Sequence, residues 1–178
     1  QGMERVRVNY NNGSPSIVPT GQLQSKAKRY YFTDSLKLDR GEAYVSPFDL
    51  NIEHGKIEEP FKPMLRFATL VFNEQGTRIG VVVLNFLGQN ILDILQEELE
   101  CDHGCPIMLI NSNRFLLKGP ASENEWAFMF KDRKERSFAN HFPNEWQRIS
   151  TSNREGQLTS KNGFFSFATV YPLRASEV

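Results

Sequence analysis

The chain has 178 residues, 39% of them hydrophobic, which is enough for one large or two small domains with a buried core. Lysine plus arginine and aspartate plus glutamate both number 21, so no strong long-range attraction to nucleic acid or to an anionic membrane is expected. The longest apolar run, residues 79–87, is far shorter than the roughly 20 residues that a membrane-spanning helix needs.

The chain begins with the pattern of a strand. Residues 4–9 alternate charged and apolar side chains, residues 11–15 have the composition of a turn, and residues 16–18 can return as a second strand. This pattern predicts a hairpin at the edge of a sheet. Because the alternation starts almost at the first residue, we expect the chain to be a piece of a longer protein.

A basic and aromatic stretch follows. Residues 22–29 are mostly good helix formers and three aromatic residues come directly after them, which predicts a short cationic helix over residues 22–32. Its cations can simply form a solvated helix face, as basic runs usually do. Alternatively, cations and tyrosines together form a cage for a small anion, because ring faces exclude water and strengthen charge pairing. Both interpretations stay open for Lys26, Lys28, Arg29, Tyr30 and Tyr31.

Three strands joined by turns are predicted next, at residues 43–46, 64–72 and 77–86. They form the core of an antiparallel sheet. In the second strand, alternation places Arg66 in mid-strand, on the same face as Ala68. A charge in that position needs a partner or a ligand.

The stretch from residue 44 to residue 66 carries more charged and hydrogen-bonding groups than a plain hairpin needs. We interpret it as the wall of a small-molecule pocket. In the empty pocket, a pair between Asp49 and Arg66 would avoid leaving a buried charge alone. The predicted ligand residues of this stretch are Tyr44, Ser46, Asp49, Asn51 and Arg66.

The remainder of the chain predicts a second module. Residues 89–99 have helical apolar spacing, which predicts an amphipathic connecting helix. Strands are predicted at residues 107–111, 114–118, 156–159 and 163–172. The aromatic residues between these strands favour a second core over a cofactor site. They are Trp126, Phe128, Phe138, Phe142 and Trp146.

Motifs of catalysis and metal binding are missing from the sequence. Without a nucleophile elbow, a glycine-rich phosphate loop or a spaced carboxylate pair, a hydrolase that uses Asp49 and His54 is disfavoured. Cys101, His103 and Cys105 supply three ligands where a zinc site needs about four. Whether the two cysteines are separate thiols or close a short disulfide loop stays open. We therefore expect no catalytic residue, metal site or cofactor.

The order of the predicted elements and several of their sequences resemble the double Cache sensor domains, the extracytoplasmic PAS-like modules of bacterial and archaeal receptors. The resemblance is strongest to the sensor regions of membrane-bound histidine kinases and diguanylate cyclases. It rests on LQSKAKRYYF, YVSPFDLNIEHGKIEEPFKPMLRFATLVF, GTRIGVVVLNFLG, and MLINSNRFLLKGP followed by EWAFMF. Together these pieces extend over most of the chain, from residue 4 to about residue 173.

The resemblance implies an α+β fold of two tandem PAS-like modules, each a mainly antiparallel sheet flanked by helices. The membrane-distal module takes residues 1–92 and lacks its N-terminal helix and first strand. Residues 93–105 are a helical connector, and residues 106–178 form the membrane-proximal module. The resemblance also implies a periplasmic location, a membrane anchor on each side of the domain in the inner membrane, a homodimer, and a cytoplasmic kinase or cyclase as the output.

The resemblance further implies a ligand. In amino-acid-binding relatives, the helix before the sheet supplies cations and an aromatic pair, and the matching residues here are Lys26, Lys28, Tyr30 and Tyr31. Where those relatives have an aspartate for the ligand ammonium, this chain has Asn85, so a carboxylate or another small polar metabolite is as reasonable as an α-amino acid. The expected function is ligand sensing, without catalysis and without a nucleic-acid partner. The alternative is a protein-interaction module that binds no small ligand.

Overall fold

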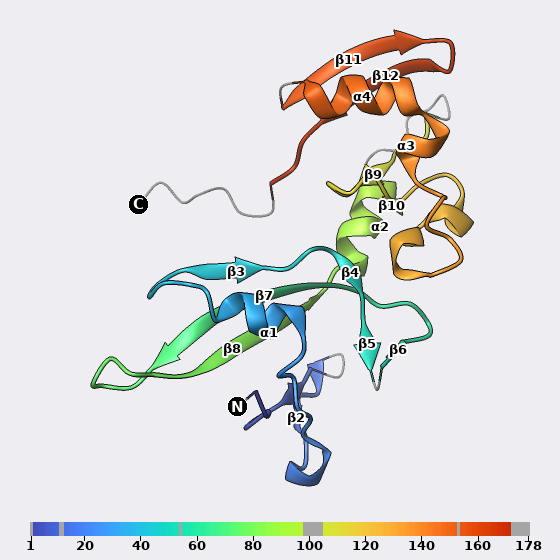
Figure 1. The fold of residues 1–178 in the computed structure, drawn as a ribbon. Helices are drawn as coiled ribbons and strands as arrows, with labels where there is room; N and C mark the ends of the chain where they lie inside the picture. The colour runs from blue at the N-terminus through green and yellow to red at the C-terminus, as the bar shows by residue number, and fades with distance from the viewer. Residues whose placement is uncertain (1, 11–12, 54, 98–104, 153, 172–178) are drawn as a thin grey trace. The chain divides into compact units, whose positions relative to one another are not determined.

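The computed structural model describes the whole chain except residues 1, 11–12, 54, 98–104, 153 and 172–178 (Figure 1). The described residues form an α+β fold of short helices and antiparallel strand pairs, which confirms the predicted fold class. The chain divides into two compact units, residues 1–46 with 66–85 and residues 47–65 with 86–178. The predicted module boundaries at residues 92 and 106 stay a prediction.

The first unit begins with the predicted hairpin. Its strands are β1 (Val8–Asn9) and β2 (Ser16–Ile17), which pair antiparallel with Val8 opposite Ile17. The regular pairing is shorter than the alternation suggested. A 3₁₀ turn, η2 (Thr20–Gln22), follows directly.

The helix predicted over residues 22–32 is wrong in position. The structure has α1 at Tyr30–Ser35, with Arg29 in an extended conformation just before it. Instead of coiling, residues 24–26 lie extended beside the start of the chain: the Glu4 N–H donates to the Gln24 carbonyl at 3.0 Å, and the Lys26 N–H donates to the Gly2 carbonyl at 2.7 Å. This strand-like pairing overrides the helix propensity of the segment, as tertiary contacts often do.

The long strands form one four-stranded sheet. Strand β3 (Ala43–Val45) pairs with β7 (Pro63–Phe72), and β7 also pairs with β4 (Asp49–Leu50) and with β8 (Arg78–Leu87). In β7, Arg66, Ala68 and Leu70 alternate on a buried face. Helix α1 lies beside β3 (Figure 1). The predicted strands and the predicted mid-strand position of Arg66 are thus present.

The second unit takes β4, a small hairpin and the C-terminal half of the chain. Its elements are β5 (Ile52–Glu53), β6 (Lys56–Ile57), α2 (Gln89–Glu97), β9 (Leu109–Ile110), β10 (Leu116–Lys118), η3 (Ser122–Asn124), η4 (Ala127–Met129), α3 (Phe138–His141), α4 (Pro143–Thr151), β11 (Glu155–Ser160) and β12 (Gly163–Ala168). The predicted connecting helix is described as far as Glu97, and the rest of it lies outside the described residues.

The core of the second unit joins residues from distant parts of the chain. Leu50, Leu92, Leu117 and Trp126 are its buried members. The Phe48 ring packs edge-on against Trp126, with 5.3 Å between the ring centroids. Of the five aromatic residues assigned to a second core, Trp126 and Phe138 are buried, and the other three are half-buried.

Helix α4 holds the β11–β12 hairpin through a buried carboxylate. Glu145 is 2% exposed, and its Oε1 accepts a hydrogen bond of 2.9 Å from the Asn162 side chain in the hairpin turn. Hydrogen bonds from the Ser160 hydroxyl, from its own backbone and from Asn162 lower the pKa of Glu145 below its usual value of 4.5. The carboxylate therefore stays charged and serves as a structural clamp inside this unit.

Candidate functional site

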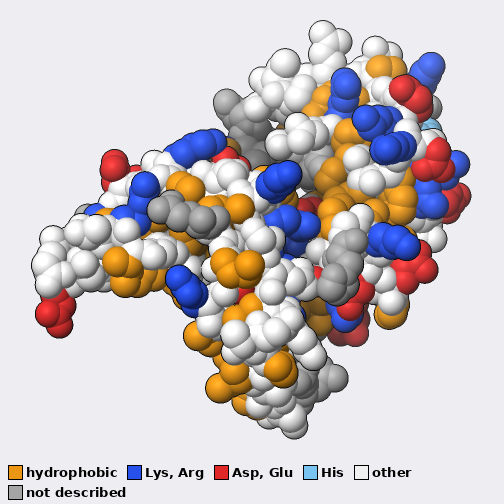
Figure 2. All heavy atoms as spheres, turned by 60° about the horizontal axis from the view of Figure 1, so that its bottom comes forward, with side chains coloured by type: hydrophobic (Ala, Val, Ile, Leu, Met, Phe, Trp, Pro, Cys, Tyr) orange, Lys and Arg blue, Asp and Glu red, His pale blue; other side chains and the backbone are white. Residues whose placement is uncertain are grey.

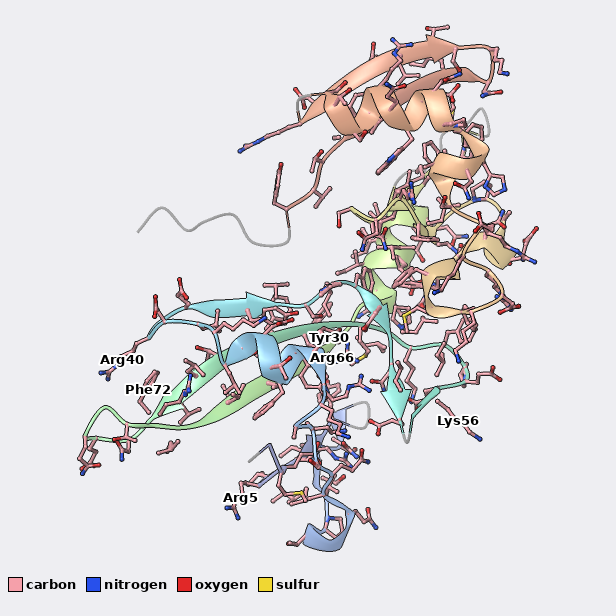
Figure 3. All side chains as sticks on the ribbon, viewed as in Figure 1. Arg5, Tyr30, Arg40, Lys56, Arg66 and Phe72 are labelled. Carbon is pink, nitrogen blue, oxygen red and sulfur yellow. The ribbon has the colours of Figure 1, made fainter. Side chains whose placement is uncertain are left out.

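The most deeply buried cation of the described chain is Arg66, which is 1% exposed in the middle of β7. Its Nη1 donates a hydrogen bond of 3.2 Å to the Tyr30 hydroxyl, and its Cζ lies 5.2 Å from the centre of the Tyr31 ring. Figure 3 shows Arg66 and Tyr30 next to each other, on β7 and α1. The packing of α1 beside the sheet therefore brings two tyrosines to a buried guanidinium.

A second guanidinium shares the same ring. The Cζ of Arg29, the residue just before α1, lies 5.4 Å from the centre of the Tyr31 ring. Tyr30 and Tyr31 meet edge to face, with 5.6 Å between their centroids. A cation over an aromatic face is held electrostatically by the ring, and two of them raise the positive potential around it.

Ser46 fixes the backbone of Arg66. The Ser46 N–H donates to the Arg66 carbonyl at 2.8 Å, and the Ser46 Oγ accepts from the Arg66 N–H at 2.9 Å. We call Arg29, Tyr30, Tyr31, Ser46 and Arg66 the Arg66 cluster. All five belong to the first unit. Their charge and hydrogen-bonding groups suit a small anion.

Tyr44 lies on the same sheet face as the cluster. It is half-buried in β3 and stands directly opposite Ala68, which shares a face with Arg66. Its place on the wall of a ligand site stays a prediction.

Other predicted ligand residues of the first unit lie in different surroundings. Lys26 reaches Gln24 Oε1 at 3.0 Å and Glu4 Oε1 at 3.7 Å, and so takes part in an ion network with the start of the chain. Lys28 and Asn85 are exposed. Glu4 is the partner that the sequence did not reveal, because nothing in the pattern relates two residues that far apart.

The two remaining predicted ligand residues, Asp49 and Asn51, belong to the second unit. Asp49 is 7% exposed in β4, and the Asn51 side chain donates a hydrogen bond of 2.9 Å to Glu58 Oε2. Hydrogen bonds from Lys62 and Asn51 lower the pKa of Glu58 below its usual value. The expected pair between Asp49 and Arg66 stays a prediction.

Open hollows lie elsewhere. One of about 710 Å³ is lined by Ser152, Arg154, Glu155 and Tyr171, and another lies along the β11–β12 hairpin, both in the second unit. Within the described ranges, no group of three or more His, Cys, Asp and Glu side chains could hold a metal ion. The sequence-predicted His54, Cys101 and His103 fall outside the described residues.

Comparison with known proteins decides the family. The family described as "Bacterial histidine kinase, sensor domain" matches residues 1–177, nearly the whole chain. The chain belongs to this family of sensor domains. No curated protein matches the chain in sequence. Among the described residues, no helix is long and apolar enough to cross a membrane.

Two solved structures share the fold of this sensor domain. A domain of a sensory box/GGDEF family protein from Vibrio parahaemolyticus aligns with a TM-score of 0.79 and 20% identity, over 96% of this chain and 63% of that one. The extracellular domain of the histidine kinase vpHK1S-Z8 aligns with a TM-score of 0.77 and 20% identity, over 95% and 59%. The chain therefore spans about three fifths of each solved structure. The predicted resemblance to sensor regions of these receptors is confirmed.

Proposed function

We propose that this sensor domain is the extracytoplasmic part of a membrane-anchored receptor, and that it binds a small carboxylate or amino-acid-like anion at the Arg66 cluster. The observation that carries the ligand proposal is the placement of two guanidinium groups over the Tyr31 ring, one of them on the buried Arg66. The extracytoplasmic location is supported by the solved extracellular domain of vpHK1S-Z8.

The chemistry of the cluster favours a carboxylate. A guanidinium can donate two parallel hydrogen bonds to the two oxygens of a carboxylate. The Tyr30 hydroxyl, which accepts from Arg66 Nη1, can also donate to a ligand oxygen because a hydroxyl both donates and accepts. Burial strengthens charge pairing because water screens it less. A carboxylate bound at the Tyr31 ring would lie close to both guanidinium groups.

Signalling in this proposal is a population shift. A ligand favours whichever arrangement of the domain binds it more tightly, and only that difference in affinity can do work elsewhere in the receptor. We propose a cytoplasmic histidine kinase or diguanylate cyclase as the output, membrane helices on both sides of the sensor domain, and a homodimer as the working form. Neither an enzyme activity of this domain nor a nucleic-acid partner is part of the proposal.

A thermal-shift screen tests the ligand class. The panel pairs small carboxylates and amino acids with the corresponding neutral amides. A ligand present at 100 times its dissociation constant adds about 2.7 kcal/mol of stability, which for a domain of this size raises the melting temperature by about 5–10 °C. Stabilisation by a carboxylate but not by its amide supports the proposal. Equal effects of acid and amide would contradict an anion site.

One observation favours the alternative of a protein-interaction module. The first hairpin exposes apolar side chains, with Val6 72%, Tyr10 73% and Ile17 76% exposed. Exposed hydrophobic side chains are also visible in Figure 2. Exposed hydrophobic side chains often mark interaction sites where they form one contiguous patch. Failure of the entire ligand panel would favour this alternative.

A further inference from the structure

Strands β3 and β4 both pair with β7, but the register changes between them. Val45 stands opposite Phe67 in the first pairing, and Asp49 stands opposite Met64 in the second. Three residues, 46–48, therefore lie between Val45 and Asp49, whereas only two, 65 and 66, lie between Met64 and Phe67 on β7. An extra residue on one strand of an antiparallel pair is a β-bulge, which bends the strand and redirects its side chains.

Ser46 and Pro47 explain why the bulge forms here. In a regular ladder the Arg66 N–H would donate to the Ser46 carbonyl. In the structure it donates to the Ser46 hydroxyl at 2.9 Å, so the side chain replaces the main chain as acceptor. Pro47 has no N–H, so leaving the ladder costs it no hydrogen bond. We call residues 46–48 the Ser46 bulge.

The Ser46 bulge coincides with the division of the chain into units. The chain passes from one unit to the other between residues 46 and 47, between 65 and 66, and between 85 and 86. The first two of these passages are at the bulge and at its partner, Arg66. The backbone that carries the buried guanidinium is thus also the backbone by which β7 enters the other unit.

We propose that Ser46 is a positioning residue and that the Ser46 bulge couples the Arg66 cluster to strand β4. The Ser46 hydroxyl holds the Arg66 backbone in register, and a shift of Arg66 displaces the bulge. The displaced bulge loosens or tightens the pairing of β4 with β7. The signalling role of this coupling rests on the proposed ligand site, because a shift of Arg66 matters only if something binds there.

Residue-resolved amide hydrogen exchange on the ligand-free 178-residue chain tests the coupling. In Ser46→Ala, we expect exchange about tenfold faster at Arg66 and in the β4–β7 pairing at Met64 and at Asn51, whose N–H donates to the Lys62 carbonyl at 2.8 Å; this is the size expected for one lost hydrogen bond. Ser46→Thr, which keeps the hydroxyl, restores slow exchange. The matched control is Thr69→Val, at a residue on the same strand, β7, as Arg66. It removes a 2.7 Å hydrogen bond from the Thr69 hydroxyl to the Glu42 carbonyl. We expect this control to leave exchange at Asn51 and Met64 unchanged.

Two results would overturn the inference. One is faster exchange in Ser46→Ala that stays at Arg66 and does not reach Asn51 and Met64. The other is an equal acceleration everywhere, β11 included, which indicates general destabilisation. If Ser46→Ala does not fold, Pro47→Ala replaces it: a restored N–H donor should change exchange at Asn51 and Met64, and unchanged rates would refute the coupling. The experiment uses no ligand, so its failure is distinguishable from failure of the ligand screen.

Discussion

The two units bury charges of opposite sign in different ways. In the second unit, hydrogen bonds from hydroxyl and amide groups of the adjacent hairpin, together with the nearby charge of Lys161, keep the Glu145 carboxylate charged. In the first unit, the Arg66 guanidinium lies against two tyrosines, with the guanidinium of Arg29 on the same ring. The buried carboxylate, held by groups of its own unit, serves as a clamp. Two cations on one ring, one of them buried, favour a small anion as a ligand.

Removing the buried cation should give the largest effect on stability. Arg66→Ala deletes the hydrogen bond to Tyr30, the contact with Tyr31 and the packing of a fully buried side chain. We expect it to lower the free energy of unfolding by about 3 kcal/mol. Urea denaturation measures the change.

The matched control for that substitution is Arg78→Ala. Arg78 is exposed in the same unit and donates a 2.7 Å hydrogen bond to the Leu36 carbonyl. Removing its side chain should lower the free energy of unfolding by at most about 1 kcal/mol. Equal losses for both variants would show that Arg66 is no more than a surface cation.

The clamp in the second unit should appear as a pH dependence. Because folding lowers the pKa of Glu145, the unfolded chain takes up the proton first as the pH falls. The stabilising contribution of the carboxylate is therefore complete above pH 4.5 and is lost as the pH falls below that value. Urea denaturation at a series of pH values should show that the free energy of unfolding falls less at acid pH in Glu145→Gln than in the wild type. An exposed control, Glu155→Gln, should keep the wild-type profile.

The smallest effect is expected at Lys26. Its contact with Glu4 is a partly buried ion pair, so Lys26→Met and Glu4→Gln should each lower stability by about 0.5–1 kcal/mol. A double-mutant cycle isolates the pairwise interaction. Additive losses would mean that the two charges do not interact, and would return Lys26 to the candidates for direct ligand contact.

The sequence was most informative where a local rule applies. Alternation alone placed Arg66 in mid-strand, and the turn before Thr77 joined two strands as predicted. The helix over residues 22–32 was misplaced because residues 24–26 pair with the start of the chain, and propensity contains no information on such pairing. The Ser46 bulge was equally out of reach, because a register is a property of two strands and not of either one.

The sequence also grouped residues that the structure assigns to different units. Asp49 and Arg66 were grouped in one polar wall, and the division of the chain into two units falls between them, so their pairing stays a prediction. For Arg29 the sequence left a solvated helix face and an anion cage both open, and the structure places its guanidinium over the Tyr31 ring. Spacing along a strand predicts which face a residue occupies, but not which element packs against that face.

Isothermal titration calorimetry with the most stabilising carboxylate of the screen tests the central claim most directly. Arg29→Met removes the second cation from the Tyr31 ring, and Arg40→Met removes a comparable arginine, 5.3 Å from the Phe72 ring in the same unit (Figure 3). We predict that Arg29→Met weakens binding by about tenfold or more, as expected for a lost charge-assisted hydrogen bond, while Arg40→Met binds like the wild type. Unchanged affinity in Arg29→Met, or equal losses in both variants, would contradict an anion site at the Arg66 cluster.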